Sequence, residues 1–397
     1  MSVVNFMENL LAGAEIGWPL LGEVTKYEQP TKYLVKAKNY SDEFAIPVLT
    51  AGKTFILGYT DETSGIYNAS ENPVIIFDDF TTANKWVDFD FKAKSSAMKM
   101  ISSSDETKYL LKYVYYWLNT LPSELVEGDH KRQWISNYAN KKIPIPCPEN
   151  PKKSLEIQAE IVRILDAFTA MTAELTAELN LRKKQYNYYR DQLLSFTEGN
   201  VEWKTLEYLC ESIAAGGDVP KNSAKGQTKP TAEYPYPIYA NATNENGLYG
   251  YTDNYKIDSD AVTISARGAK VGYHTVREAK FTPIIRLIVL VANKNLIRTK
   301  YLNYVLDMTP IGGTEGGIPQ LTVPMVKKIT VPIPFPNDPE KSLVEQARIV
   351  SILDKFDTLT TSLQEGLPRE IELRQKQYEY YRDLLLSFPM PNTEVAA

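Results

Sequence analysis

An internal repeat covers most of this sequence, and no other feature of the sequence limits the fold so strongly. Residues 143–166 return as residues 331–354 at an offset of 188, with 15 of 24 positions identical. Residues 181–196 return as residues 373–388 at an offset of 192, with 13 of 16 identical. The segment that starts at Trp18 has a fainter counterpart in the second half. Chance does not produce such identity, so we infer that one unit was duplicated and expect two similar domains.

The constant part of each repeat is predicted to be a long helix. No proline interrupts residues 154–196. The three-and-four spacing of a helical apolar stripe is followed by Ile161, Ile164, Phe168, Met171 and Leu175. At 1.5 Å per residue these 43 residues would extend roughly 64 Å. A helix of that length with a single apolar stripe needs a partner. The second copy is the obvious one, so we expect an antiparallel pair.

The ends of these helices carry local signals. Ser342 followed by Glu345 has the pattern of a capping box, and Ser154 occupies the equivalent position, so both helices are predicted to begin there. The second helix is four residues longer than the first, around residues 366–370. Pro368 lies within this insertion, and we expect it to kink or break the helix because proline removes a backbone donor.

The variable part of each repeat is predicted to be a mixed domain of strands and helices. Short β-rich runs are broken by Gly, Asn and Asp, and they cover residues 46–59, 72–79, 260–267 and 281–291. Helical patterns cover residues 109–121 and 299–308. Both variable parts end in extended stretches with alternating prolines, at residues 143–148 and 331–336.

Composition and motifs exclude most enzyme classes. Two cysteines and two histidines leave no disulfide scaffold, structural zinc site or histidine-based catalytic set. Residues 51–54 resemble the end of a phosphate-binding loop, but the position five residues before Gly52 is Pro47 rather than glycine. The longest apolar run is too short to span a bilayer and the N-terminus is a poor signal peptide, so a cytoplasmic protein without a membrane partner is expected.

One acidic set keeps a catalytic alternative open. Asp79, Asp90 and Lys92 imitate the residues with which many nucleases hold Mg²⁺. The other interpretation is an exposed strand over residues 87–94 whose aromatic residues, Phe89 among them, face inward. The second copy lacks an equivalent acidic set, which disfavours catalysis. A Mg²⁺-dependent nuclease therefore remains the alternative hypothesis, beside a coiled-coil adaptor that binds only proteins.

Clusters of polar, cationic and aromatic residues favour recognition of nucleic acid instead. The net charge of −5 argues against a basic protein, yet residues 201–330 carry 15 basic and 12 acidic side chains, a net of +3. Small hydroxyls, amides and cations of this kind contact phosphate oxygens and base edges. The candidate DNA-binding residues are Lys53, Thr81, Thr82, Asn84, Lys85, His130, Lys131 and Arg132 in the first half, and Asn241, Arg267, Lys270, Tyr273 and Gln320 in the second. Gln320 stands at the repeat offset from the cluster that begins at His130.

This layout resembles the specificity subunit of Type I restriction–modification enzymes, in particular the type IC group. The resemblance covers essentially the whole chain, and it is carried by the paired endings at 185–196 and 377–388 and by the repeated tetrapeptide Thr-Ala-Glu-Leu at 172–179. It implies an α+β fold in which two mixed α/β target-recognition domains are separated by two long antiparallel helices that form a coiled coil, with an internal pseudo-two-fold repeat. The implied boundaries are 1–151 and 198–339 for the recognition domains, 152–197 and 340–388 for the spacer helices, and 389–397 for a disordered tail.

The resemblance also implies a function. The chain is expected to catalyse nothing by itself and to read a split, asymmetric site on double-stranded DNA, one domain on each half-site. It would bind two methyltransferase subunits, and restriction subunits would join them. S-adenosylmethionine, ATP and Mg²⁺ are expected on those partners, and no cofactor on this chain. The helix residues expected to form the spacer or to bind partners are Ile161, Phe168, Leu175, Leu179, Tyr186, Tyr189, Ile349, Phe356, Tyr378 and Tyr381.

Overall fold

The computed structural model divides the chain into two compact units, and each unit combines segments that are distant in sequence. The first unit holds residues 1–175 with 371–397, and the second holds residues 176–370. The residues that the structure describes are 14–36, 40–52, 54–122, 132–196, 200–241, 247–268, 270–312, 319–362 and 364–388. Residues 389–397, for which a disordered tail is expected, lie outside this set.

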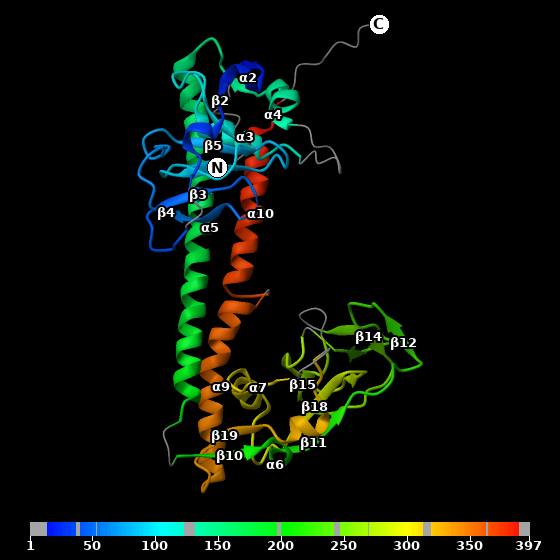
Figure 1. The fold of residues 1–397 in the computed structure, drawn as a ribbon. Coiled ribbons are helices and arrows are strands. Elements are labelled where there is room, and N and C mark those ends of the chain that lie inside the picture. Colours follow the sequence, from blue (N-terminus) through cyan, green and yellow to red (C-terminus); the bar gives the residue numbers. More distant parts are fainter. Residues whose placement is uncertain are drawn as a thin grey trace. The chain divides into compact units, whose positions relative to one another are not determined.

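The first unit is built on a four-stranded antiparallel sheet with a smaller sheet beside it (Figure 1). The large sheet has the order β2-β8-β5-β6 and the small one the order β4-β3-β7. Its elements are β1 (Ile16–Gly17), α2 (Leu21–Val24), β2 (Thr25–Glu28), η1 (Pro30–Tyr33), β3 (Ile46–Leu49), β4 (Ile56–Thr60), β5 (Val74–Asp78), β6 (Asn84–Val87), β7 (Lys92–Ala93), β8 (Met98–Ser103), α3 (Leu111–Leu118), α4 (Gln133–Ser136), η2 (Tyr138–Asn140) and β9 (Ile145–Pro146). The strands expected at 46–59 and 72–79 and the helix at 109–121 are confirmed.

The second unit repeats this plan with one additional strand. Its large sheet has the order β11-β18-β15-β16 and its small sheet the order β12-β14-β13-β17. Its elements are β10 (Val201–Thr205), α6 (Leu206–Leu209), β11 (Cys210–Ala215), β12 (Ser223–Lys225), β13 (Tyr236–Tyr239), β14 (Leu248–Thr252), β15 (Ala261–Ser265), β16 (His274–Arg277), β17 (Thr282–Pro283), β18 (Leu287–Ala292), α7 (Thr299–Asp307), α8 (Val323–Lys327) and β19 (Thr330–Pro334). Strand β12 has no counterpart among the strands that the structure describes in the first unit.

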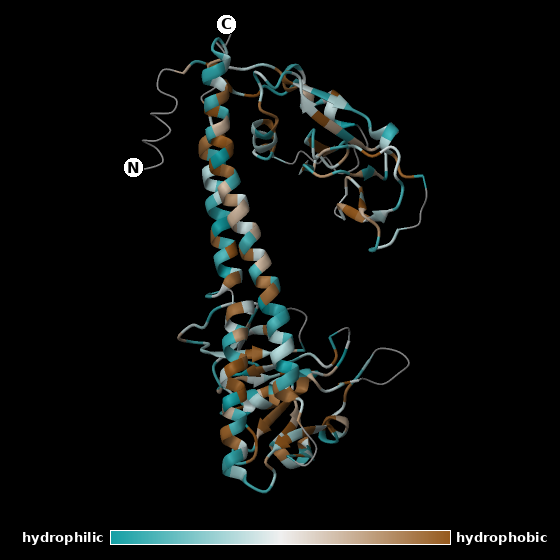
Figure 2. Cartoon of the chain, turned by 90° about the vertical axis from the view of Figure 1, so that its left-hand side faces the viewer, coloured by the Kyte–Doolittle hydropathy of each residue, from teal (hydrophilic) through white to brown (hydrophobic). Residues whose placement is uncertain are grey.

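Equivalent hydrogen bonds tie the helix beside each large sheet to the extended stretch before the long helix. The Tyr113 hydroxyl of α3 donates to the Pro144 carbonyl at 2.7 Å, and the Tyr301 hydroxyl of α7 donates to the Pro332 carbonyl at 2.9 Å. All residues of β5 and of β15 are buried, as expected for strands at the centre of a sheet under a helix. The inner strands β5, β15 and β18 are apolar, whereas the long helices alternate between polar and apolar residues (Figure 2).

The long helices pack against each other within each unit. Helix α5 (Pro151–Leu194) has 44 residues, so the predicted long helix is confirmed. Figures 1 and 2 show α5 beside α10 (Leu367–Leu386) in the first unit and beside α9 (Pro339–Thr361) in the second, and the paired helices run antiparallel. The C-terminal end of the first repeat therefore packs in the second unit, and the C-terminal end of the second repeat packs in the first unit. Leu385 and Leu386 lie in the core of the first unit, and Leu194 lies in that of the second.

The break expected in the second helix is present. Helix α9 ends at Thr361 and α10 begins at Leu367. Gly366 has a φ of +95°, and a side chain there would meet the Thr358 carbonyl oxygen at 2.5 Å, so only glycine fits this turn. Pro368 is the second residue of α10, where proline is tolerated because the first helical N–H groups have no intrahelical acceptor.

The predicted helix starts are wrong by one turn. Helices α5 and α9 begin at Pro151 and Pro339, not at the two serines. Asp338 caps α9 by accepting a hydrogen bond from the Lys341 backbone N–H at 3.0 Å. The reason is that proline at the first helical position fixes a helical φ, and a short acidic or amide side chain just before it can accept from the first turn.

Candidate nucleic-acid interface

Each unit ends its central strand in a hairpin turn with the same hydrogen-bonded frame. The Asp78 N–H donates to the Ala83 carbonyl at 2.8 Å between β5 and β6, and the Ser265 N–H donates to the Tyr273 carbonyl at 2.8 Å between β15 and β16. Thr82 in the first turn has a φ of +60°, and Gly272 has a φ of +84° at the matching place in the second. The two turns are therefore equivalent parts of one fold, and they carry different residues.

A second segment from about 50 residues further along joins each turn. In the first unit the Gln133 N–H donates to the Asp79 carbonyl at 2.8 Å. In the second unit the Leu321 N–H donates to the Ala266 carbonyl, also at 2.8 Å. We call residues 79–85 with 132–134 the first tip, and the described residues of 266–273 with 319–321 and Asn241 the second tip.

The structure brings the predicted residues of the second half together. Arg267 forms an antiparallel bridge with Gln320, and the Asn241 amide donates to the Arg267 carbonyl at 2.8 Å. Lys270 and Tyr273 lie on the same turn and are exposed. This tip therefore presents a guanidinium, an ammonium, two amides and a phenol, which are the groups that contact phosphates and base edges.

The first tip presents a smaller set. Thr81, Lys85 and Arg132 are exposed, and Asn84 is half-buried. Thr82 is only 7% exposed, so we remove it from the proposed contact surface. The remaining predicted residues, Lys53, His130 and Lys131, lie outside the residues that the structure describes.

The aromatic residue of the segment 130–134 belongs to the core. Trp134 is 1% exposed, and its ring packs edge-on against Phe77 at 5.0 Å between centroids. A ring in this position anchors the segment and cannot stack on a base. Burial here depends on the distant strand β5, which the sequence near residue 134 does not reveal.

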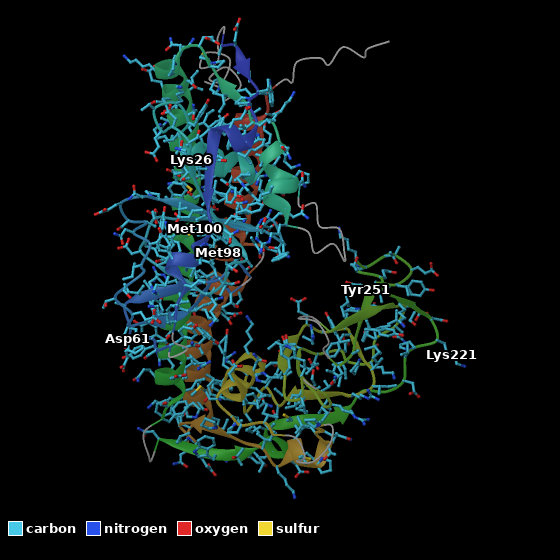
Figure 3. All side chains as sticks on the ribbon, turned by 45° about the horizontal axis from the view of Figure 1, so that its top comes forward. Lys26, Asp61, Met98, Met100, Lys221 and Tyr251 are labelled. Atoms are coloured by element: carbon cyan, nitrogen blue, oxygen red, sulfur yellow. The ribbon has the colours of Figure 1, made fainter. Side chains whose placement is uncertain are left out.

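The small sheet of the second unit carries an aromatic and basic surface that is absent from the predicted DNA-binding residues. The Lys225 ammonium lies 5.6 Å from the centroid of Tyr249, and the Lys280 ammonium lies 5.8 Å from that of Tyr255. Figure 3 shows Tyr251 on β14 and Lys221 just before the neighbouring edge strand, β12. Interleaved lysines and tyrosines between residues 221 and 256 were a usable signal for nucleic-acid binding.

The acidic set of the nuclease alternative is divided among separate interactions. Lys92 is buried and pairs with Glu62 at 3.1 Å. Asp90 accepts hydrogen bonds from the Ser70 hydroxyl and N–H, and this lowers the pKa of its carboxyl group. Asp79 instead accepts from the Trp134 N–H. Within the described ranges, no group of three or more His, Cys, Asp or Glu side chains could hold a metal ion.

The alternative expectation of a regular strand over 87–94 is also wrong. Strand β6 ends at Val87, and the chain leaves regular structure until β7 begins at Lys92. Phe89 consequently faces outward with 37% of its surface exposed, whereas Phe91 is buried. The alternation of side chains between faces fails because the ladder does not continue.

The helix residues predicted as spacer or partner contacts lie mainly in the helix pairs. Ile161 and Ile349 are fully buried, and Leu175 and Leu179 are half-buried. Two aromatic pairs hold the helices together. Phe168 stacks on Tyr381 at 5.1 Å in the first unit, and Tyr189 stacks on Phe356 at 5.4 Å in the second. Burial raises the pKa of both Tyr186 and Tyr378 to about 12.

Two tyrosines that were not among these predictions remain exposed at equivalent positions. Tyr188 is 61% exposed and Tyr380 is 62% exposed, at the repeat offset of 192. Each ring lies edge-on to the next tyrosine of its helix, at 5.4 and 5.3 Å. Exposed aromatic side chains held in this way are typical of protein interfaces.

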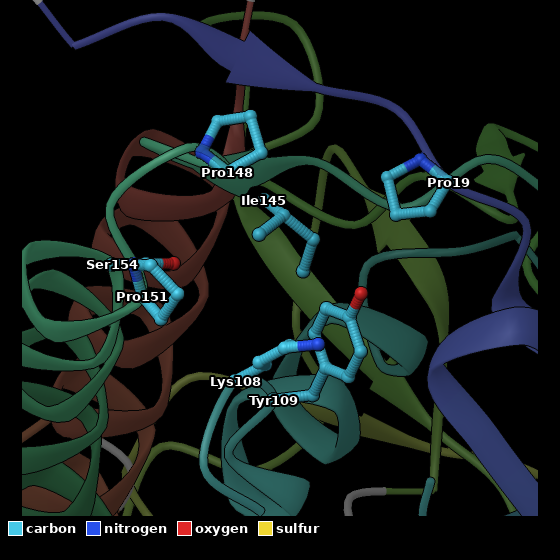
Figure 4. Close-up of a pocket in the computed structure, with 7 residues that line it drawn as sticks. All are labelled: Pro19, Lys108, Tyr109, Ile145, Pro148, Pro151 and Ser154. Carbon is cyan, nitrogen blue, oxygen red and sulfur yellow. The ribbon is translucent and has the colours of Figure 1, made fainter. Parts of the chain in front are cut away.

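Small pockets at the start of α5 and α9 are also equivalent. The first is shown in Figure 4 and is lined by Pro19, Lys108, Tyr109, Ile145, Pro148, Pro151 and Ser154. The pocket in the second unit uses the matching residues Ile333, Pro336, Pro339 and Ser342. The two serine hydroxyls accept hydrogen bonds from Gln158 and Gln346, so these serines are engaged in structural contacts.

Comparison with known proteins gives a consistent result. The chain matches the sequence model of the Type I restriction modification DNA specificity domain twice, over residues 20–182 and 199–373. The specificity subunit of the Type I restriction enzyme EcoR124I/EcoR124II of Escherichia coli is 57% identical, with 99% of both chains covered. A putative Type I restriction enzyme specificity subunit of Haemophilus influenzae is 32% identical, with 96% of this chain and 98% of the relative covered.

A solved structure shares the fold. The crystal structure of a Type I restriction–modification S subunit from M. genitalium has a TM-score of 0.63 at 15% identity, and the match covers 95% of this chain and 97% of the other. Among the helices that the structure describes, none is both long and apolar enough to span a bilayer.

Proposed function

Because this chain belongs to the family of Type I restriction–modification DNA specificity domains, we propose that it reads a split, asymmetric DNA site with one unit on each half-site. In this proposal the tips carry the recognition, and the chain catalyses no step itself. Two methyltransferase subunits bind the helix pairs, and restriction subunits join the complex. S-adenosylmethionine, ATP and Mg²⁺ stay on those partners.

The observation that carries the proposal is that one backbone frame displays two different sets of side chains. Thr81, Lys85 and Arg132 occupy the first tip, whereas Arg267 and Gln320 occupy the second. Arginine pairs with guanine edges and glutamine with adenine edges, so tips with different residues select different bases. Two half-sites of unlike sequence follow from two such tips.

The test measures each half-site separately. The chain is purified with its methyltransferase partners, and the methylated adenines in a random DNA library are mapped. We expect Arg132→Ala to relax base preference in one half-site only, and Arg267→Ala with Gln320→Ala to relax it in the other. Each contact should change discrimination by about tenfold. Relaxation of both half-sites by one variant, or of neither, contradicts the proposal.

The equivalent exposed tyrosines support binding of two copies of one partner. Tyr188 and Tyr380 repeat at the same offset as the helices that carry them and have nearly the same exposure. A surface that is kept in both copies, while the tips diverge, fits a partner that is present twice. We expect Tyr188→Ala to reduce the complex to one methyltransferase subunit, and Tyr188→Ala with Tyr380→Ala to leave none.

Native mass spectrometry of the complex checks this stoichiometry. Val344→Ala is the matched control because Val344 is 64% exposed on α9 and lies outside the tyrosine pair. Two bound subunits on the double tyrosine variant would show that these helix faces do not hold the partner.

The tetrapeptide repeat within α5 supports a spacing role. Residues 172–179 lie inside the continuous helix, and four more residues lengthen a helix by roughly 6 Å. A base pair rises about 3.4 Å along the duplex. We therefore expect one additional Thr-Ala-Glu-Leu unit to change the gap between the half-sites while both half-site sequences stay the same, as the mapping experiment above would show.

A further inference from the structure

We propose that Asp79 and Lys99 are positioning residues that set the base preference of the first tip without touching DNA. The pair holds the segment 132–134 against the β5–β6 turn and thereby fixes where Arg132 presents its side chain. This inference rests on the proposed function of the first tip. It concerns residues that lie beneath that surface.

The two side chains form a buried ion pair. Lys99 lies in β8 with none of its surface exposed, and Asp79 directly follows β5 with 1% exposed. Their charged atoms, Nζ and Oδ2, are 3.6 Å apart. The Lys99 ammonium makes no hydrogen bond and lies 4.7 Å from the centroid of the Tyr27 ring. Burial of two charges with incomplete hydrogen bonding is costly, so the pair contributes little to stability by itself.

The Asp79 N–H donates to the Ala97 carbonyl at 3.3 Å. Asp79 also accepts two hydrogen bonds, and both come from the segment that carries Arg132. Its Oδ1 atom accepts a hydrogen bond from the Trp134 N–H at 2.8 Å. Its backbone carbonyl accepts one from the Gln133 N–H at 2.8 Å. Two successive amides are therefore held by one residue, immediately after Arg132. The carboxylate is the part of this anchor that depends on Lys99 for a compensating charge.

The second unit shows what occupies these positions when the pair is missing. Lys99 pairs with Phe77 in the ladder between β5 and β8, and Ile288 occupies the matching place between β15 and β18. Asp79 lies two residues beyond Phe77, and Ala266 fills its place in the second unit. Both replacements are apolar and buried.

The backbone frame of the tip survives this replacement. The Leu321 N–H still donates to the Ala266 carbonyl at 2.8 Å, as Gln133 does to Asp79. The additional side-chain bond to the next amide is the feature that the ion pair provides in the first unit alone. Since the fold does not need the charges, we infer that the first tip keeps them for the position of Arg132.

The experiment copies the second unit into the first. In the complex with methyltransferase subunits, Asp79→Ala with Lys99→Ile removes the side-chain acceptor and leaves no unpaired charge. We expect a folded protein with a Tm close to that of the wild type, about tenfold weaker discrimination in the half-site of the first unit, and no change in the other half-site. The readout is the map of methylated adenines in a random DNA library.

A conservative variant separates position from stability. Asp79→Asn with Lys99→Met keeps an oxygen that can accept from the Trp134 N–H while removing both charges. We expect it to retain the wild-type preference at both half-sites. Loss of preference in this variant overturns the positioning role.

Three results of the first variant are decisive. Unchanged preference at both half-sites means that the pair does not position the tip. Failure to fold means that the pair is needed for stability, which also overturns the inference. Equal relaxation of both half-sites instead contradicts the proposed assignment of one unit to each half-site.

Discussion

The two units keep one set of buried hydrogen bonds and differ in the charged pairs around their hairpins. In both units a buried glutamine of the long helix forms hydrogen bonds with the backbone just before the shorter helix, α3 or α7. The Gln158 side chain accepts from the Leu110 N–H at 2.8 Å, and Gln346 accepts from the Arg298 N–H at 2.9 Å. These contacts, unlike the tips, survived divergence, so they belong to the frame on which the variable surface is carried.

Charge is distributed differently around the hairpins. The first unit has its ion pair beneath the turn, at Asp79 and Lys99. The second unit has His274 at the start of β16, with Nε2 3.5 Å from an Asp307 oxygen at the end of α7. The place of Asp307 is taken in the first unit by Asn119, at the repeat offset of 188. The comparison teaches that charged pairs around the hairpins adapt one copy, whereas buried amides and phenols maintain both. The ion pair between the covering helix and the long helix is also kept, as Lys112 with Asp166 and Lys300 with Asp354.

The comparison is tested most severely by moving the buried lysine into the second unit. Ile288→Lys places an ammonium in a core that offers Ala266 instead of a carboxylate, so we expect a loss of about 3–5 kcal/mol in the free energy of unfolding. Ala266→Asp added to this variant should restore part of the loss. Urea titration measures both. Ile285→Lys, at a position that is 50% exposed, is the control and should change little.

Removal of the shared glutamines should cost the two units equally. Gln158→Leu leaves the Leu110 N–H and the Lys108 carbonyl without their partner, and Gln346→Leu does the same in the second unit. We expect about 2–3 kcal/mol for each, from urea titration. Gln192→Leu, on the exposed face of α5, is the control. A clear difference between the two core variants would show that the frame is not equivalent.

Alkaline pH should loosen both helix pairs. Burial raises the pKa of Tyr186 and Tyr378 from 10.0 to about 12. A raised pKa in the folded state means that the neutral phenols stabilise the fold fully below pH 10, and that this contribution is lost as the pH rises through 12.

The Tm of the wild type should fall between pH 10 and pH 12, and in the double variant Tyr186→Phe with Tyr378→Phe this fall should be smaller by a few degrees. Thermal unfolding followed by circular dichroism checks it, with Tyr188→Phe and Tyr380→Phe as the exposed control pair. An identical pH profile for wild type and the buried double variant would contradict this account.

The smallest expected effect comes from making the second unit resemble the first at the end of α7. Burial raises the pKa of Asp307 above its usual value near 3.8. The nearby charge of Asp357 also raises this pKa, whereas His274 and Arg190 act to lower it. The stability that this carboxyl group contributes is present below pH 3.8 and is lost as the pH rises through its folded-state pKa.

Asp307→Asn should then raise the Tm slightly at neutral pH and leave it unchanged in acid, because the amide does not ionise. Differential scanning calorimetry at both pH values makes the measurement. A Tm gain that is larger in acid than at neutral pH would reverse the sign and refute the argument.

The sequence by itself determined the duplication, the long helix, its broken partner and the mixed character of each domain. These features depend on identity at a fixed offset and on local periodicity, which a single chain displays directly. The equivalence of Gln320 with the segment near Arg132 also followed from the offset, and the ladder and turn hydrogen bonds confirm it.

Only the tertiary structure decided which half of each helix packs in which unit, because two nearly identical copies offer the same apolar stripe to either domain. It also brought residues 132–134 to a turn about 50 residues earlier, buried Trp134 and Thr82, and paired the Lys99 ammonium with the Asp79 carboxylate. The physical reason is that burial and charge pairing depend on strands that are adjacent in the sheet but distant along the chain. Local patterns reveal the elements, and the ladders between them decide which side chains meet.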